Sequence, residues 1–173
     1  VLADRGYSVR LLLRPSARRS RLPVPPAEAV VASFQDEGGI RAAVAGVDSI
    51  IHLASAEGEH RHRDLFAVDV EGTRSLLTQA KASGVKRILY LSHLGAARGS
   101  AFPFLQAKGV AAHAVMESGI PYLILRSSLV YGAGDSFTNA IAFFARLLPA
   151  AYFIPEMDTH MQPLWVEELA ACM

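Results

Sequence analysis

The chain has 173 residues, of which 51% are hydrophobic, and its formal net charge is +1. This length and composition are those of one folded domain with a sizeable core, and they exclude an intrinsically disordered chain. The near-neutral charge provides no general basic field for nucleic acid or an anionic membrane. The most apolar stretch, from Ala140 to Ile154, contains Arg146 and Pro149 and falls short of the roughly 20 residues that a membrane span requires.

The cysteine content indicates the cellular compartment, and the two ends of the chain indicate whether it is part of a longer protein. Cys172 is the one cysteine and cannot form an internal disulfide, which agrees with a reducing compartment, so we expect a cytoplasmic protein. Val1–Gly6 has the pattern of a last helical turn closed by glycine, and Val166–Met173 begins a helical pattern and stops. We therefore expect an internal piece of a longer protein.

Short apolar runs alternate with segments of helical periodicity along most of the chain. Strands are predicted at Tyr7–Leu13, from Val30–Val31, and at Val47–Leu53, Val85–Leu91 and Tyr122–Leu125. Helices are predicted around Ile40–Val44, Phe66–Ala80 and Phe104–Glu117, each followed by glycine. The mostly apolar Val47–Leu53 run is typical of a strand buried on both faces. Because parallel strands need crossover connections, this order predicts an α/β fold with a parallel sheet and helices on both faces.

Four segments together resemble the extended and atypical short-chain dehydrogenase/reductase superfamily, most closely its NmrA-like and complex I 39-kDa-subunit-like branches. These segments are Ala45–Ala54, Val68–Arg74, Gly84–Ser92 and Leu125–Asp135. The resemblance implies a Rossmann-like, doubly wound, three-layer NAD(P)-binding domain over residues 1–173, incomplete at both ends, with 136–173 beginning the substrate-side region.

The glycine-rich turn that carries the pyrophosphate in such folds is not found in this sequence. By register with the family, the first strand and its glycine loop would lie just upstream of Val1, whereas Gly38-Gly39 and Gly132–Gly134 are expected to be ordinary turns. The missing strand would pair with both Tyr7–Leu13 and Val47–Leu53. We therefore predict that residues 1–173 alone do not form a stable cofactor-binding domain.

The resemblance also implies which residues contact the cofactor. Arg14 follows a strand where NAD-preferring proteins usually have an acidic residue, and a guanidinium there favours the 2′-phosphate of NADP, with NAD as the alternative. Ser16, Arg18 and Arg19 are close enough to assist, although a solvated basic loop is the competing interpretation. Ser33 departs from an aspartate that relatives place near the adenine. The other expected contacts are Leu53, Ala54, Ser55, Ser92, Lys108, Arg126, Ser127, Ser128 and Leu129.

The catalytic pattern of the family is incomplete. Its reaction needs a Tyr-x-x-x-Lys pair on one helical face, and Phe104 stands at the tyrosine position four residues before Lys108. Lys108 either binds ribose without catalysis or is a surface lysine on an amphipathic helix. His93 replaces the companion serine or threonine and is either an acid that titrates near neutral pH or an ordinary polar residue at a strand end. Tyr131 is an alternative phenol on a different segment.

Several functions stay open at this point. A metal site at His60–Arg63 is disfavoured because no cysteine or carboxylate pattern completes it, so no metal is expected. Gln162 and Trp165 either line a substrate pocket or pack in a core. The favoured function is NADP-preferring cofactor binding with a degenerate catalytic tyrosine. The alternatives are an active NADP-dependent oxidoreductase or epimerase/dehydratase acting on a small molecule, and a redox-sensing or protein-interaction subunit that uses Phe143-Phe144 and Leu147-Leu148.

Overall fold

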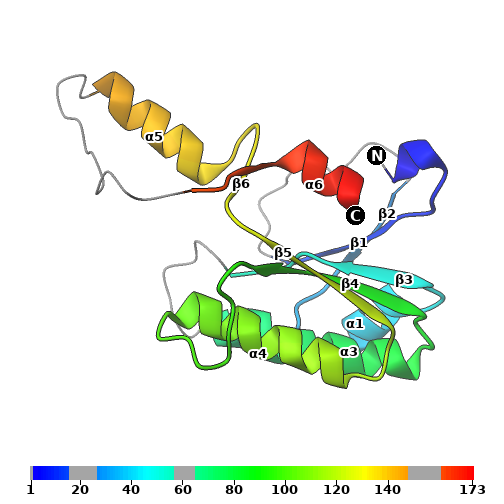
Figure 1. The fold of residues 1–173 in the computed structure, drawn as a ribbon. Coiled ribbons are helices and arrows are strands. Elements are labelled where there is room, and N and C mark those ends of the chain that lie inside the picture. The colour runs from blue at the N-terminus through cyan, green and yellow to red at the C-terminus, as the bar shows by residue number, and fades with distance from the viewer. Residues whose placement is uncertain (1, 16–26, 57–64, 148–160) are drawn as a thin grey trace. The chain divides into compact units, whose positions relative to one another are not determined.

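The structure is a computed structural model that describes residues 2–15, 27–56, 65–147 and 161–173. The chain divides into two compact units, Val1–Arg126 and Ser127–Met173 (Figure 1). The elements that begin in the first unit are η1 (Ala3–Arg5), β1 (Arg10–Leu13), β2 (Glu28–Val31), α1 (Glu37–Val44), β3 (Ser49–His52), the π-helical η2 (Phe66–Gly72), α3 (Thr73–Ala82), β4 (Arg87–His93), α4 (Pro103–Glu117) and β5 (Tyr122–Ser127).

Two sheets form in the first unit. In one, β1 pairs in parallel with β2, so that Arg10 lies opposite Glu28 and Leu13 opposite Val31. In the other, β4 lies between β3 and β5, and β3 runs parallel to β4. Right-handed crossovers that step in one direction across a sheet place their helices on one face. Figure 1 shows α1, α3 and α4 along one face of the β3–β4–β5 sheet, and α3 and α4 connect its strands as this rule requires. The helices predicted on the other face of the sheet are not found in the described part of this unit.

Local signals in the sequence explain where the helices begin and end. The Asp36 carboxylate caps α1 and accepts a hydrogen bond of 2.9 Å from the Gly39 N–H, and Pro103 occupies the first turn of α4. Gly84 has a φ of 72° just after α3, a conformation that glycine adopts without a steric penalty. The core between sheet and helices comprises Ile40, Val44, Leu76, Leu77, Ala80, Val85, Ile88, Tyr90, Ala111, Ala112, Val115 and Ile120.

Among the described residues of the first unit, no strand ladder joins the two sheets. As predicted, β1 and β3 are unpaired with one another among the described residues. A cavity of about 380 Å³ lies between them, lined by Arg10, Leu11 and Leu12 on one side and by 49–54 on the other. The prediction that Val47–Leu53 is buried on both faces is wrong for Asp48, Ser49 and Leu53, which are exposed, because among the described residues no strand pairs with the open edge of β3.

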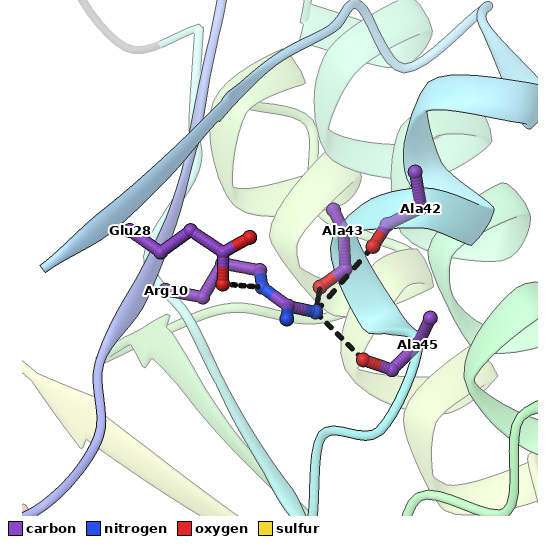
Figure 2. Close-up of polar contacts among 5 residues, drawn as sticks. All are labelled: Arg10, Glu28, Ala42, Ala43 and Ala45. Carbon is purple, nitrogen blue, oxygen red and sulfur yellow. Dashed lines mark hydrogen bonds and ion pairs between the residues drawn. The ribbon is translucent and has the colours of Figure 1, made fainter.

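Arg10 connects the β1–β2 sheet to α1 (Figure 2). Its Nε donates to Glu28 at 2.7 Å, and one terminal nitrogen donates to the carbonyls of Ala45 at 2.6 Å and Ala43 at 3.1 Å. These carbonyls lie at the carboxyl end of α1, where the backbone lacks partners and the helix dipole is negative. Because α1 also packs on α3, this guanidinium anchors β1 in the absence of a ladder to β3.

The second unit contains β6 (Val130–Tyr131), α5 (Ser136–Leu147), β7 (Leu164–Trp165) and α6 (Val166–Cys172). The strands β6 and β7 pair in parallel, and the Tyr131 and Trp165 rings contact edge to face at 5.3 Å. Asp135 caps α5 by accepting from the Thr138 N–H at 2.6 Å and from the Thr138 hydroxyl. These hydrogen bonds hold the pKa of Asp135 below its ordinary value.

The predicted alternation of strands and helices is confirmed, with some corrections. Gly132–Gly134 forms a turn, as predicted, but the prediction of a turn at Gly38-Gly39 is wrong, because the Asp36 cap draws both glycines into the first turn of α1. The helix predicted over Phe66–Ala80 begins as the π-helical η2 and continues as α3. None of the helices in the described ranges is long and apolar enough to traverse a lipid bilayer.

Candidate functional site

The predicted cofactor residues of the first unit follow the carboxyl ends of its strands. Arg14 follows β1, Ser33 follows β2, Leu53 to Ser55 follow β3, and Ser92 and His93 end β4. In open α/β sheets, ligands bind outside these carboxyl ends. Arg14 and Leu53 are exposed, while Ser33, Ala54 and Ser55 are partly buried, so this edge offers small side chains together with one guanidinium.

Phe34 links the two sheets at this edge. Its ring meets the His52 ring edge to face, with the centroids 5.9 Å apart. The ring also lies against Gly72, where an added Cβ would come within 2.7 Å of Phe34 Cγ. Position 72 therefore needs glycine to let η2 approach the segment after β2, and the ends of β2 and β3 are held together by packing.

A buried ion pair lies beneath the same edge. Lys108 Nζ of α4 is 2.9 Å from Asp69 Oδ1 of η2, and the side chains are 7% and 0% exposed. The other carboxylate oxygen, Oδ2, accepts a hydrogen bond of 2.9 Å from the Ala56 N–H, in the segment that follows β3. The ammonium also lies 5.5 Å from the centroid of the Tyr90 ring. The interpretation of Lys108 as a surface lysine is therefore wrong, because its helix face packs on η2 and β4.

His52 belongs to the same buried cluster. Its Nε2 lies 2.8 Å from the Thr73 hydroxyl, and that hydroxyl donates its only hydrogen to the Asp69 carbonyl at 2.6 Å. The hydroxyl oxygen must therefore accept from His52, so that Nε2 carries the proton of the neutral ring. Burial, followed by the Lys108 charge, lowers the pKa of His52 to about 4.

Phe104 stands one helical turn before Lys108, as predicted, with its ring centroid 5.9 Å from the ammonium. Its ring also meets the His93 ring edge to face at 5.5 Å. His93 Nδ1 lies 2.6 Å from the Leu94 carbonyl, which can only accept, so Nδ1 carries a hydrogen. In the neutral ring the proton-accepting nitrogen is then Nε2. The structure thus brings His93, Phe104 and Lys108 together.

Tyr90 and Ser92 point from β4 into the protein. Among the described residues, the Tyr90 hydroxyl and the Ser92 hydroxyl have no hydrogen-bond partner, and both residues are buried. Burial, followed by the Asp69 carboxylate, raises the pKa of the Tyr90 phenol far above its ordinary value. Tyr90 is therefore a neutral part of the core at physiological pH.

Sequence reasoning missed Asp69, His52, Thr73 and Ala56 as parts of the site. One signal was available, because Asp69 lies between two valines in a helix whose other inward positions are apolar. A carboxylate on an apolar face requires a partner, and Lys108 was the unexplained cation. The pairing itself depends on how α4 meets η2, which helical periodicity does not reveal.

The remaining predicted residues lie elsewhere. Arg126 is exposed on β5, Ser127 is buried at the end of that strand, and Ser128 and Leu129 follow in the second unit. Trp165 packs on Tyr131, and Gln162 is exposed. Ser16, Arg18, Arg19, His60–Arg63 and Leu148 lie outside the described residues. Within the described ranges, no three His, Cys, Asp or Glu side chains are grouped to hold a metal ion.

Comparison with known proteins identifies the class. Residues 1–137 match the NAD(P)H-binding family, and the chain belongs to that family. It is 29% identical over 136 residues to the mitochondrial NADH dehydrogenase [ubiquinone] 1 alpha subcomplex subunit 9 of Mus musculus, covering 79% of this chain and 36% of the relative. It is also 29% identical over 126 residues to the uncharacterized sugar epimerase YhfK of Bacillus subtilis, covering 69% of this chain and 59% of that protein. The chain thus spans only part of the curated relatives that it matches.

Solved structures share the fold. The Bordetella bronchiseptica enzyme WbmH in complex with NAD+ matches with a TM-score of 0.84 at 18% identity, covering 99% of this chain and 64% of that one. The UDP-glucose 4-epimerase of Thermus thermophilus in complex with NAD matches with a TM-score of 0.76 at 20% identity, covering 98% and 66%. The predicted Rossmann-like fold and the resemblance to the short-chain dehydrogenase/epimerase superfamily are confirmed.

Proposed function

We propose that this chain is the cofactor-binding part of an NADP(H)-binding protein that does not transfer protons by the usual tyrosine mechanism. The observation that carries the proposal is the state of the Tyr-x-x-x-Lys position. Phe104 has no proton to transfer, and the Lys108 ammonium is paired with Asp69 instead of with a phenol. Within the superfamily, we place the protein near the NmrA-like and complex I subunit branches, in a reducing, cytoplasmic setting.

The residues after the strands fit a dinucleotide in part. Arg14 would bind the ribose end, Ser33 would lie near the adenine, and the small residues Ala54 and Ser55 would allow the cofactor backbone to approach closely. Bound NADP(H) would supply hydride-transfer chemistry. The contribution of the described residues is to bind and orient it. A glycine-rich phosphate turn is not among them, so tight binding requires residues that supply one.

The preference for NADP rests on Arg14. A guanidinium there provides paired, charge-assisted hydrogen bonds to a 2′-phosphate, whereas NAD lacks this group. The two solved complexes named above contain NAD, which is the alternative cofactor considered for this chain. The test is a fluorescence titration of the full-length protein with NADPH and with NADH.

The Arg14→Asp variant is expected to weaken NADPH binding by about tenfold or more and to leave NADH binding little changed or improved. Arg87→Asp is the matched control, because Arg87 is also exposed but starts β4 at the opposite edge of the sheet. Equal loss of NADPH affinity in both variants, or tighter NADH than NADPH binding in the natural protein, would overturn the preference.

A second candidate is an active NADP-dependent oxidoreductase or epimerase/dehydratase that uses His93. It is favoured by the contact between the His93 and Phe104 rings and by the orientation of the imidazole through its Leu94 bond. A protonated His93 donates from Nε2 beside the position of the missing phenol. NADPH-dependent carbonyl reduction that is present in the natural protein and lost in His93→Gln would support this candidate over the first.

A protein-interaction role is the third function considered. The mouse relative is named as a subunit of NADH dehydrogenase, and Phe143 and Phe144 on α5 each have an exposed fraction of 59%. Exposed aromatic side chains of this kind favour a protein partner. Phe143→Asp combined with Phe144→Asp is expected to shift the protein to a smaller assembly in size-exclusion chromatography. An unchanged elution volume would remove α5 from consideration.

A further inference from the structure

We propose that Asp69 is a positioning residue that neutralises the Lys108 ammonium and fixes it to the backbone that follows β3. The proposal deepens the proposed function, because it explains why the lysine of the family pattern is present without its tyrosine. In this protein Lys108 acts as the internal counterion of a buried carboxylate. At position 104 it is therefore not an uncompensated cation that could lower the pKa of a phenol.

The two oxygens of the Asp69 carboxylate contact two different segments of the chain. Oδ1 of Asp69 pairs with Lys108 Nζ at 2.9 Å, and Oδ2 accepts from the Ala56 N–H at 2.9 Å. One side chain on η2 therefore connects α4 to the segment where the cofactor is expected to pass. Since the Asp69 side chain is fully buried, water does not screen or replace these contacts.

The charges of Lys108 and Asp69 together determine the electric field at position 104. An unpaired ammonium 5.9 Å from its ring would lower the pKa of a phenol at this position by roughly one to two pH units. With the carboxylate at 2.9 Å from the same ammonium, the field of the pair is that of a dipole and most of this effect is lost. Asp69 thus cancels most of the effect that the Lys108 charge would have on the pKa of a phenol at position 104.

The test places a phenol at position 104 and measures its titration without cofactor. Full-length protein carrying Phe104→Tyr is labelled with 13Cζ-tyrosine, and the resonance that appears with the substitution is followed against pH. The midpoint is compared with that of Phe104→Tyr/Asp69→Asn. Among the described residues, His93 and Lys108 contact the ring at position 104, and Asp69 and Tyr90 contact Lys108. All but Asp69 are the same in both variants, so the difference reports the carboxylate.

We expect the phenol to titrate about one pH unit or more lower when Asp69 is replaced by asparagine. The same midpoint in both variants would overturn the proposal, because it would mean that Asp69 does not compensate Lys108. Asparagine keeps an oxygen that can accept from the Ala56 N–H, so the substitution removes the charge and conserves the shape.

A third variant keeps the test decisive if Asp69→Asn leaves Lys108 uncompensated and the fold is lost. In Phe104→Tyr/Asp69→Asn/Lys108→Met both charges are removed together, which costs little stability. If the pair is neutral as seen from position 104, its phenol titrates with the same midpoint as in Phe104→Tyr alone. A midpoint one to two pH units higher would show that the lysine acts uncompensated and would refute the proposal.

These outcomes are independent of cofactor preference. Failure of the natural protein to bind NADPH would overturn the proposed function and leave the titration result intact. Tight NADPH binding by the natural protein, together with the same phenol midpoint in Phe104→Tyr and Phe104→Tyr/Asp69→Asn, would support the proposed function and overturn the role of Asp69.

Discussion

Lys108 and Asp69 form an ion pair that water barely reaches. Their charged atoms lie 2.9 Å apart, and the two side chains are 7% and 0% exposed. A buried pair of this kind contributes modest net stability, but removal of one partner leaves a charge that nothing compensates. The ion pair connects α4, which carries the incomplete Tyr-x-x-x-Lys pattern, to the π-helical η2 beneath the proposed cofactor edge.

The first prediction concerns this pair and stability. Lys108→Met is expected to lower the free energy of unfolding by about 3–5 kcal/mol, because it leaves the Asp69 carboxylate buried and alone. Lys108→Met/Asp69→Asn is expected to recover most of that loss, since no charge stays behind. Urea denaturation of the natural protein, both single variants and the double variant gives the coupling energy. Additive losses in the double variant would contradict the prediction.

The second prediction concerns pH. The pKa of His52 is about 4 in the folded protein and 6.5 as its ordinary value. The unfolded chain therefore takes up the proton first as pH falls, so the stability due to neutral His52 is complete above pH 6.5 and is lost progressively toward pH 4. A difference of this size corresponds to roughly 3 kcal/mol.

The control for this prediction is His52→Gln, whose amide can still donate to Thr73 but does not titrate. Unfolding free energies measured between pH 7 and pH 4 should fall more steeply for the natural protein than for the variant. Parallel curves would show that His52 is not the group responsible.

The third prediction concerns the contact between α4 and the loop after β4. A Cβ added at Gly109 would meet the Ala97 carbonyl carbon at 2.3 Å, and backbone cannot move aside easily. Gly109→Ala is therefore expected to cost about 1–3 kcal/mol despite the better helix propensity of alanine. Gly99→Ala is the matched control, because a Cβ there meets nothing within 4 Å. Equal thermal unfolding temperatures for the two variants would be inconsistent with the close approach.

The fourth prediction concerns the anchoring of β1. Arg10→Met removes the charge-assisted hydrogen bonds to the α1 carbonyls and to Glu28, with an expected cost of about 1–3 kcal/mol. Lys86→Met removes the Lys86–Asp48 ion pair, whose side chains are 76% and 74% exposed, and no measurable change is expected. Denaturant midpoints distinguish the two. A larger effect at Lys86 would mean that the guanidinium does not hold the two sheets together.

Much of the fold could be read from the sequence. The alternation of apolar runs and helical periodicity located strands β1 to β5 and the helices between them, because periodicity follows directly from which face is buried. The boundaries were less exact, since β1 begins at Arg10 instead of Tyr7, and Val30 and Val31 end β2 instead of beginning it. The resemblance to the dehydrogenase superfamily also predicted that β1 and β3 would be unpaired with one another, as they are among the described residues.

The site was less predictable. The spacing of Phe104 and Lys108 on one helical face was evident, but the burial of Lys108 depends on the packing of α4 against η2. Likewise, the requirement for glycine at positions 72 and 109 arises from close approach of segments distant in sequence, which no local pattern encodes.

The fifth prediction returns to the open edges of β1 and β3. A polypeptide of residues 1–173 is expected to show neither cooperative thermal unfolding nor micromolar binding of NADPH, because both edges and the cavity between them lack a covering strand in the described structure. Full-length protein measured in parallel provides the reference. A sharp melting transition with micromolar NADPH affinity in the short polypeptide would refute this prediction.

The π-helical geometry of η2 makes the Lys108–Asp69 pair sensitive to chain length. Each hydrogen bond of a π-helix joins residues i and i+5, so it spans one more residue than a hydrogen bond of an α-helix. Deleting one residue from Phe66–Gly72 would let the segment relax to α-helix and rotate part of it by about 100° relative to the rest. Single-residue deletions or insertions in this segment therefore threaten the alignment of Asp69 with Lys108 more than most substitutions on the same turn.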